Sequence, residues 1–520
     1  MSFQTKTLHL HTRHISVFNV SLKRPKSGGP DPRSETFVMA RGVRITDDKG
    51  FKMSHLFRLA GASALALFAA APAFAQETIR GQGATLPAGL YADWFNPGPN
   101  AAFSYSYNAA LIRPSGGSIP ANTGSGAGKA SFENHMFNNN TWFPGGSGTP
   151  AQPLPSDVTT AQKEDIQFAG SDAILTTADL DTYNAARWGD PIQVPSVGTP
   201  VTLAFNKASL TLKKKGPTGL VDGDGKQVVG KILYLSRASY CGIFTGGISR
   251  WNDPLIVRDN GKAPSNQEIK VVVRSDSSGT TEIFSRHLDT VCDGSAAAGG
   301  FSFPSTNSTD PSQPTGKTTI AWSDLIPSGR LIPAAGSGGV STAIANNAFA
   351  IGYVSPDYTD LIATPAAGAG SPAPSTANLQ NQFDIDNGTF KNYKRSASWS
   401  NVDSAMRSMT PPAVTDSALV WGQKLAILDP VVNNPTQKNA YPIVGFTFLN
   451  FYTCYPNSKI AGVKSFAEYV FSKKSGAKAR AGGFTPLSTS FRNAVNARLF
   501  ATGTSPRGLS KGKISGYCSL

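Results

Sequence analysis

Three glycine-rich turns, each opening onto a predicted helix, place the strongest limit on how this chain can fold. The first, GQGATLP at 81–87, follows a short predicted strand from Thr78 and precedes an amphipathic stretch at 90–95. The second, at 124–129, precedes a predicted helix at 130–136, and the third, at 277–281, precedes one at 282–288. Strand-turn-helix units are typical of α/β structure, and 52 glycines with 36 prolines argue against a helical bundle. We therefore expect an α/β fold.

The same turns predict a binding site for an anion. The first backbone N–H groups of a helix have no partner within the helix, and the helix dipole adds partial positive charge there. One such turn is a weak signal, but three that contain hydroxyl residues favour a shared site. Two predicted strands also end in charged residues, Asp172 after 166–171 and Arg274 after 271–273. The carboxyl edge of an open α/β sheet is where ligands bind, so both side chains are candidate contacts.

These residue types suit hydrogen phosphate in particular. Arg274 can make a bidentate contact to the anion, and Asp276, two residues further on, can hold the guanidinium in place. Asp172 can accept the proton that hydrogen phosphate retains near neutral pH, whereas sulfate has no such proton and would leave the carboxylate unpaired. The alternative is structural: Asp172 caps the segment after it, and Arg274 only pairs with Asp276.

Seven stretches spread over nearly the whole chain from Gln76 resemble the phosphate-binding proteins of phosphate ABC transporters, most closely their DING subgroup. They are GQGATLP from Gly81, GSGAGKASF from Gly124, FAGSDAIL from Phe168, QVPSVGTPVTLAFNK from Gln193, YCGIFTGGISRWND from Tyr240, RSDSSGTTEIF from Arg274 and YPIVGFTFLNFYTCY from Tyr441. One departure is at the start, where residues 77–81, ETIRG, stand in place of the Asp-Ile-Asn-Gly that names the subgroup.

The resemblance implies a two-lobed periplasmic-binding-protein fold of type II, in which each lobe is a mixed sheet flanked by helices and two strands form a hinge. We expect lobe I at 76–200 plus 448–520 and lobe II at 201–447, with the hinge strands near 197–206 and 442–451. Carried over by position, the phosphate contacts would be Thr85, the Leu86 amide, Ser125, Asp172, Arg274, Ser278, the Gly279 amide and Thr280, supported by Asp276. The implied partners are inorganic phosphate and an inner-membrane phosphate permease complex. We expect a monomer without a cofactor.

Residues 53–75 have the features of an export signal. A short basic region with Arg58 precedes an apolar stretch too short to span a bilayer, and Ala73-Phe74-Ala75 resembles a cleavage site before Gln76. A buried helix is the alternative. Since the first cysteine is Cys241, no lipid anchor is expected at the cleavage site, and the protein should be periplasmic or secreted. Residues 1–52, with ten Lys/Arg against four Asp/Glu, indicate a misassigned start or a basic extension, either of which should carry no fold.

Four cysteines in an exported chain predict two disulfide bonds. The sequence allows three pairings, of which we choose Cys241 with Cys292 and Cys454 with Cys518. None of the four has Cys-x-x-Cys spacing, so a zinc or redox site is not expected.

The net charge does not indicate nucleic acid as a partner. The whole chain carries +15, of which +6 belongs to residues 1–52 and +1 to Arg58, so the part from Gln76 carries +8. It lacks a basic-aromatic patch or a recognition-helix pattern, so a small anion fits the charge better than nucleic acid does.

Two other functions remain as alternatives. Some DING-like proteins are associated with phosphatase activity, and the predicted site has serines beside an arginine. The chain from Gln76 contains only His135 and His287, neither next to a predicted contact, so we expect a binding protein and not an enzyme. The other alternative is a secreted adhesion or matrix protein that retains a phosphate site.

Overall fold

The computed structural model describes residues 3–10, 13–20, 76–142, 150–221, 226–304, 316–388, 395–515 and 517–519. The predicted export signal at 53–75 lies outside the described residues. The chain divides into two units, Met1–Pro72 and Ala73–Leu520. In the first unit, β1 (Phe3–Leu10) and β2 (Arg13–Val20) pair as an antiparallel hairpin. The expectation of no fold in residues 1–52 therefore misses this hairpin, whose strands contain the β-branched residues that favour extended structure.

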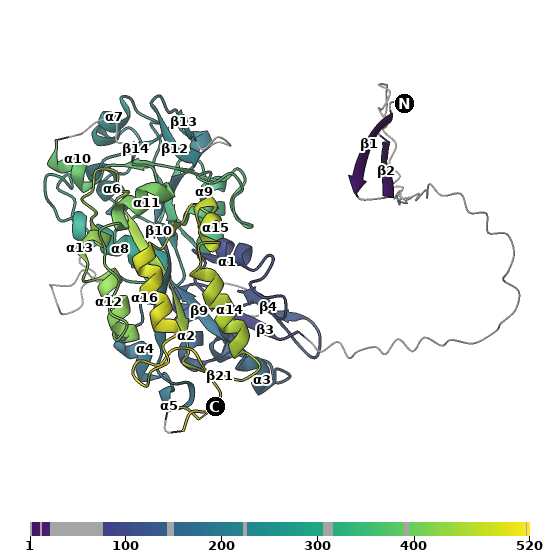
Figure 1. The fold of residues 1–520 in the computed structure, drawn as a ribbon. Helices are drawn as coiled ribbons and strands as arrows, with labels where there is room; N and C mark the ends of the chain where they lie inside the picture. Colours follow the sequence, from purple (N-terminus) through teal and green to yellow (C-terminus); the bar gives the residue numbers. More distant parts are fainter. Residues whose placement is uncertain are drawn as a thin grey trace, which may run out of the picture. The chain divides into compact units, whose positions relative to one another are not determined.

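The second unit contains two larger sheets, each of which belongs to one lobe (Figure 1). The sheet of lobe I has the order β22-β10-β20-β9-β3-β4, in which β3 pairs in parallel with β4 and β9, and the other pairs are antiparallel. Its strands are β3 (Thr78–Gly83), β4 (Ser104–Tyr107), β9 (Phe168–Ser171), β10 (Ile192–Pro200), β20 (Val444–Phe451) and β22 (Thr485–Pro486). Every residue of β9, β10 and β20 is buried, including polar residues such as Gln193, Thr447 and Asn450.

The sheet of lobe II is also mixed and has the order β16-β15-β17-β11-β18. β15 pairs in parallel with β16 and β17, while β11 pairs antiparallel with β17 and β18. The strands are β11 (Thr202–Phe205), β15 (Lys270–Arg274), β16 (Leu331–Ala334), β17 (Ala350–Val354) and β18 (Ser375–Thr376). β18 is buried and forms the edge of this sheet beside β11.

Two crossing strands connect the lobes. β10 belongs to the first sheet and β11, one residue later, to the second, so the chain crosses at Val201. The Val201 amide donates a 3.0 Å hydrogen bond to the carbonyl of Ile443, just before the returning strand β20 begins. The two-lobed α/β fold with a two-strand hinge is confirmed. The residue boundaries of the lobes stay a prediction.

Helices cover both sheets. On the first sheet α2 packs on β3 and β9, α11 and α12 pack on β10, and α16 also contacts β10. On the second sheet α9 packs on β15, β16 and β17, and α8 contacts β17. The main helices are α1 (Ala88–Trp94), α2 (Ser125–Asn134), α6 (Arg237–Phe244), α7 (Pro254–Asn260), α8 (Gly279–Val291), α9 (Gly336–Asn346), α11 (Trp399–Met406), α12 (Ala418–Ala426), α14 (Ile460–Val470), α15 (Ser475–Ala481) and α16 (Thr489–Leu499). Among the described residues, none of the helices combines the length and apolar character needed to cross a membrane.

Helix α2 begins earlier than the sequence predicts, because its glycines are helical rather than part of the turn. Gly124, at φ 107°, precedes the helix, and residues 125–128 form its first turn. A Cβ on Gly128 would lie 2.5 Å from the Gly170 carbonyl oxygen and 2.8 Å from the Gly83 Cα. Glycine at 128 therefore lets the helix lie directly against β3 and β9, which brings its N-terminus to the edge of the sheet.

Both predicted disulfide bonds are present. Cys241 pairs with Cys292 and Cys454 pairs with Cys518, so the chosen pairing is confirmed. The first bond joins α6 to the end of α8, the helix that begins at the candidate site.

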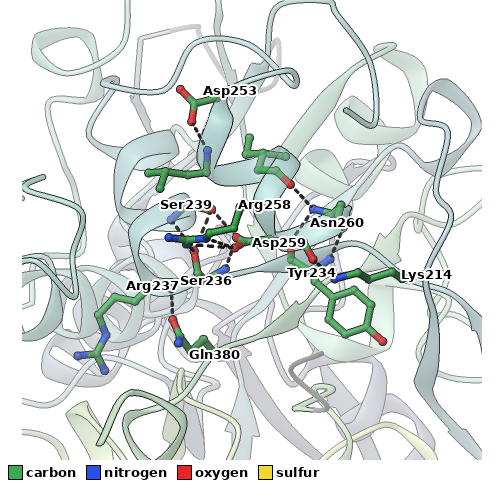
Figure 2. A network of polar contacts seen from close by, with 12 residues as sticks. Lys214, Tyr234, Ser236, Arg237, Ser239, Asp253, Arg258, Asp259, Asn260 and Gln380 are labelled. Atoms are coloured by element: carbon green, nitrogen blue, oxygen red, sulfur yellow. Dashed lines mark hydrogen bonds and ion pairs between the residues drawn. The ribbon is translucent and has the colours of Figure 1, made fainter. Parts of the chain in front are cut away.

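A polar network centred on the buried Asp259 joins α6 and α7 (Figure 2). Asp259 accepts hydrogen bonds from the Ser236 amide at 2.7 Å and the Ser239 hydroxyl at 2.5 Å, and it pairs with Arg258 at 3.1 Å. Asn260 donates to the Tyr234 carbonyl at 2.9 Å. Because these groups satisfy one another, we assign the network a structural role.

Candidate functional site

Asp172 and Ser125 meet at the carboxyl edge of the first sheet. Asp172 follows β9 directly and is 1% exposed, and Ser125 is the first residue of α2. The Asp172 amide donates to the Ser125 hydroxyl at 3.0 Å, and the Ser125 hydroxyl in turn donates to the Asp172 Oδ2 at 3.4 Å. The sheet edge and the helix start are therefore joined at the two residues that the sequence singles out.

Thr447 completes the surroundings of Asp172. Its hydroxyl donates to the Asp172 Oδ1 at 3.1 Å from the neighbouring strand β20. Sequence reasoning missed this residue, although it lies in the quoted stretch from Tyr441 and is a polar residue within a buried strand. Thr447 fixes one carboxylate oxygen, and the other lies toward the Ser125 hydroxyl.

Burial raises the pKa of Asp172 from 3.8 to about 7, although hydrogen bonds from Thr447 and Ser125 and the charge of Arg274 act in the opposite direction. A carboxyl group with this pKa is balanced near neutral pH between its two protonation states. It can therefore share a proton with a ligand.

Arg274 lies at the end of β15 with its side chain 2% exposed. Its Nε donates to the Asp276 Oδ1 at 2.7 Å, and its Nη2 contacts the Asp276 Oδ2, which makes the pair bidentate. The Gly336 amide also donates to the Asp276 Oδ1 at 3.0 Å. Burial acts to raise the pKa of Asp276, but Arg274 and the Gly336 amide outweigh it and hold that pKa below its ordinary value. Asp276 therefore orients the guanidinium, as the sequence predicts.

Helix α8 begins beside both charged residues. Ser278 is its N-cap and accepts from the Thr281 amide at 3.2 Å, and the Thr280 hydroxyl lies 3.4 Å from the Arg274 Nη1. A Cβ added to Gly279 would lie 2.4–2.5 Å from the Ala173 amide nitrogen, the Asp172 carbonyl carbon and the Ser125 hydroxyl. The N-terminus of α8, in lobe II, thus lies against the edge of the lobe I sheet.

Thr85 and Leu86 lie between β3 and α1, with Leu86 buried. The Thr85 hydroxyl accepts from the Ser337 amide at 3.1 Å and lies 3.3 Å from the Ser337 hydroxyl. Ser337 is in the first turn of α9 and is 1% exposed. We did not predict it as a contact, although the glycine-rich sequence at 336–340 before a helix is the same signal as in the other turns.

The predicted contacts therefore come together from both lobes. Thr85 meets Ser337, Gly279 meets Asp172 and Ser125, and the Gly126 amide donates to the Ser277 carbonyl at 3.2 Å. The helix starts of α2, α8 and α9 and the turn before α1 meet in one place that contains a buried carboxyl group and a buried guanidinium. Such a set of donors with one protonatable acceptor suits an anion that carries a proton.

The two histidines of the second unit are packed in its interior. His135 stacks on Trp188 with ring centroids 3.4 Å apart, and burial lowers its pKa to about 3. His287 contacts the Tyr240 hydroxyl at 3.1 Å and the Asn433 carbonyl at 2.8 Å, and burial lowers its pKa to about 3 as well. No group of three or more His, Cys, Asp or Glu side chains that could hold a metal occurs within the described ranges.

Comparison with known proteins identifies relatives over most of the chain. Residues 69–474 match the family described as the PBP superfamily domain. A protein of Pseudomonas aeruginosa named alkaline phosphatase L is 30% identical over 437 residues, covering 82% of this chain and 89% of the relative. A phosphate-binding protein from an unknown prokaryotic organism is 30% identical over 435 residues, covering 81% of this chain and 93% of the relative.

Solved structures show the same fold. A high-affinity periplasmic phosphate-binding protein called PfluDING, solved with bound phosphate, is 28% identical with a TM-score of 0.56. A human phosphate-binding apolipoprotein is 26% identical, also with a TM-score of 0.56. Each covers 83% of this chain and 96% of the solved chain.

Proposed function

Because the chain belongs to the PBP superfamily and, within it, to the DING-type phosphate-binding proteins, we propose that it captures hydrogen phosphate between its two lobes. The observation that carries this proposal is the meeting of Asp172 and Arg274 at the N-terminus of α8. The ligand contacts would be Thr85, the Leu86 amide, Ser125, Asp172, Arg274, Ser278, the Gly279 amide and Thr280, with Asp276 and Thr447 in support.

The charges of the site match a protonated oxyanion. The guanidinium of Arg274 would neutralise part of the ligand charge, and helix-start amides and hydroxyls would satisfy the remaining oxygens without further formal charge. Asp172 would accept the ligand proton, and its pKa of about 7 allows this exchange near neutral pH. Sulfate in the same place would face a carboxylate with no proton between them, which costs about 1–3 kcal/mol or more for an unpaired buried group.

The cellular role follows from the family. We propose that the protein is periplasmic or secreted and delivers phosphate to an inner-membrane permease complex. The arrangement of the lobes supports this proposal, because a permease can distinguish the liganded protein only if the ligand changes how the two lobes meet.

A phosphatase is the second candidate, since the relative from Pseudomonas aeruginosa carries that name. We propose binding in preference to hydrolysis because both histidines of the second unit, the residue type that most often activates a serine nucleophile, are held elsewhere. His135 stacks on Trp188, and His287 is held by Tyr240 and the Asn433 carbonyl, away from the helix starts of the site.

The test is calorimetric titration of phosphate-free protein with phosphate and sulfate at pH 7, together with an assay for hydrolysis of p-nitrophenyl phosphate. One-to-one phosphate binding, no sulfate heat and no turnover support the proposal. A folded protein that gives no phosphate heat, or that hydrolyses the ester with turnover, contradicts it.

A further inference from the structure

A buried tyrosine of lobe II contacts the two segments that carry the lobe II half of the candidate site. Tyr353 lies on β17, the strand next to β15 in the second sheet, and is 0% exposed. Its hydroxyl accepts from the Arg274 amide at 3.2 Å and lies 2.8 Å from the Thr281 hydroxyl. Arg274 ends β15, and Thr281 is in the first turn of α8. One hydroxyl therefore joins the strand that holds the guanidinium to the start of the helix beside it.

The register of the sheet explains why a side chain makes this contact. The parallel pairing of β15 with β17 ends at Val272 with Gly352. The Arg274 amide lies beyond the end of this backbone ladder, and the Tyr353 hydroxyl is its acceptor. Buried backbone amides are almost always paired, so this acceptor matters for the conformation of the strand end. Tyr353 thus extends the contact between the two strands as far as the residue that would bind the anion.

The hydrogen bonds around this hydroxyl follow a direction. A phenol has one proton to donate and also accepts hydrogen bonds. Because the Arg274 amide donates to Tyr353, the phenol proton is available to the Thr281 Oγ1, and this arrangement satisfies a buried donor. The Thr281 amide in turn donates to the Ser278 hydroxyl at 3.2 Å. The contacts therefore lead from the backbone of Arg274 through Tyr353 to the N-cap of α8.

The ring of Tyr353 is held as firmly as its hydroxyl. Its centroid lies 4.7 Å from that of Phe284 in α8 and 5.9 Å from that of Trp322. Burial raises the pKa of Tyr353 above its ordinary value, although its hydrogen bonds and the charge of Arg274 act in the opposite direction. The hydroxyl therefore keeps its proton near neutral pH, and both the ring and the hydroxyl contact α8.

We propose that Tyr353 is a positioning residue for phosphate binding, which sets the separation between the guanidinium of Arg274 and the first turn of α8. It acts through Arg274 and Ser278 and not by contact with the anion. Donors from two different elements can serve one small anion only if each is held within about 0.5 Å of the right place. This inference rests on the proposed function, because the residues that Tyr353 positions are proposed phosphate contacts.

The hydroxyl acts on the lobe II half of the site. On the lobe I side, Asp172 is held by Thr447 and Ser125, and the described hydrogen bonds of these three residues do not include Tyr353. Loss of the Tyr353 hydroxyl should therefore weaken phosphate binding and leave the rejection of sulfate, which we attribute to Asp172, unchanged. A substitution that loosened the whole site would relax the rejection of sulfate as well.

Calorimetry with phosphate and sulfate at pH 7 compares Tyr353→Phe, which removes the hydroxyl and keeps the ring, with the control Tyr234→Phe. Tyr234 is also buried in lobe II, and its hydroxyl donates to the Lys215 carbonyl at 3.1 Å, in a segment without a predicted contact. Phosphate affinity should fall about tenfold in Tyr353→Phe and stay unchanged in the control, with no sulfate heat in either. Wild-type phosphate affinity in Tyr353→Phe, equal losses in the two variants, or sulfate binding by Tyr353→Phe overturns the proposal.

Thr281 provides a second test that leaves the tyrosine in place. Thr281→Val removes the hydroxyl that Tyr353 contacts, whereas Thr281→Ser keeps it. Thr281→Val should bind phosphate more weakly than the wild type, and Thr281→Ser should bind it equally well. The double variant Tyr353→Phe/Thr281→Val should lose less than the product of the two single losses, because both changes remove the same hydrogen bond. Equal affinities of Thr281→Val and Thr281→Ser, or losses that multiply in the double variant, overturn the proposal.

Hydrogen exchange of the phosphate-free protein separates this inference from the proposed function. The Arg274 amide should exchange at least tenfold faster in Tyr353→Phe than in the wild type or in Tyr234→Phe, because its acceptor is gone. Unchanged exchange overturns the positioning role whether or not phosphate binds. A wild-type protein that binds no phosphate overturns the proposed function, while faster exchange in the variant would still show that Tyr353 holds the Arg274 backbone.

Discussion

Replacing Asp172 by asparagine is the sharpest test of how the site distinguishes phosphate from sulfate. Asparagine keeps the shape and the oxygen that accepts from Thr447 at 3.1 Å, but it places an NH2 group where the Oδ2 faces Ser125. The variant thus loses the acceptor for the ligand proton and gains a donor. A hydrogen bond to a charged group contributes about 1.5–3 kcal/mol, so phosphate affinity should fall by about 10- to 150-fold. Sulfate affinity should rise, because the NH2 group of the asparagine can donate a hydrogen bond to an unprotonated sulfate oxygen.

The assay is calorimetric titration with each anion, and the matched control is Asp181→Asn, which makes the same charge change at an exposed position of the same lobe. The control should bind phosphate as the wild type does. Asp172→Asn with wild-type phosphate affinity and continued rejection of sulfate would show that Asp172 does not accept the proton. The discrimination would then come from the helix starts alone.

The same substitution should change how the protein responds to pH. In the empty site the pKa of Asp172 is raised from 3.8 to about 7, so the protonated form is favoured by the folded state. Its contribution to stability is present below pH 3.8 and is lost as pH rises through 7. Without phosphate, we therefore compare the melting temperatures of Asp172→Asn and the wild type at two pH values. The melting temperature of the variant minus that of the wild type should be larger at pH 8 than at pH 4. A difference in melting temperature that does not vary with pH would contradict the raised pKa.

Three further predictions concern the guanidinium, the lobe contact and the disulfide. Arg274→Lys keeps the positive charge but loses the planar guanidinium that can make two parallel hydrogen bonds. Calorimetry should show at least tenfold weaker phosphate binding, while the far-UV circular dichroism spectrum stays unchanged. Unchanged phosphate affinity would exclude a bidentate role for Arg274. Gly279→Ala should weaken phosphate binding because its Cβ would lie 2.4–2.5 Å from atoms of the opposite lobe, whereas Gly329→Ala, with open space around it, should not. Cys241 and Cys292 close a loop of 51 residues, so replacing both by serine should lower the free energy of unfolding by about 4 kcal/mol. Denaturant titration measures this loss. A loss below about 1 kcal/mol would mean that the unfolded chain is already restricted in this loop.

The sequence predicts the parts of the site that depend on local chain geometry. A strand that ends in a charged residue places that residue at the carboxyl edge of its sheet, and this holds for both Asp172 and Arg274. Asp276 could be predicted because its partner is two residues away. The four cysteines permit three pairings, and the chosen one is present.

Contacts made across the fold could not be predicted in the same way. Thr447 reaches Asp172 only because β20 lies beside β9, and that pairing joins segments far apart in the chain. Ser337 reaches Thr85 only because the lobes meet, although its glycine-rich surroundings carried the relevant signal.

The glycine-rich turns have a second role that their resemblance to anion sites does not explain. These turns leave the N–H groups at the helix starts available to an anion. Glycine at three positions also allows the two lobes to contact each other. A Cβ on Gly124 would lie 2.7 Å from the Asp276 Oδ2, one on Gly126 would lie 2.2 Å from the Ser277 hydroxyl, and one on Gly279 would lie 2.5 Å from the Ser125 hydroxyl. Each clash is with the opposite lobe. The glycines that expose helix-start amides to an anion are thus also those that let the two lobes close on it, so amide binding and lobe contact depend on the same residues.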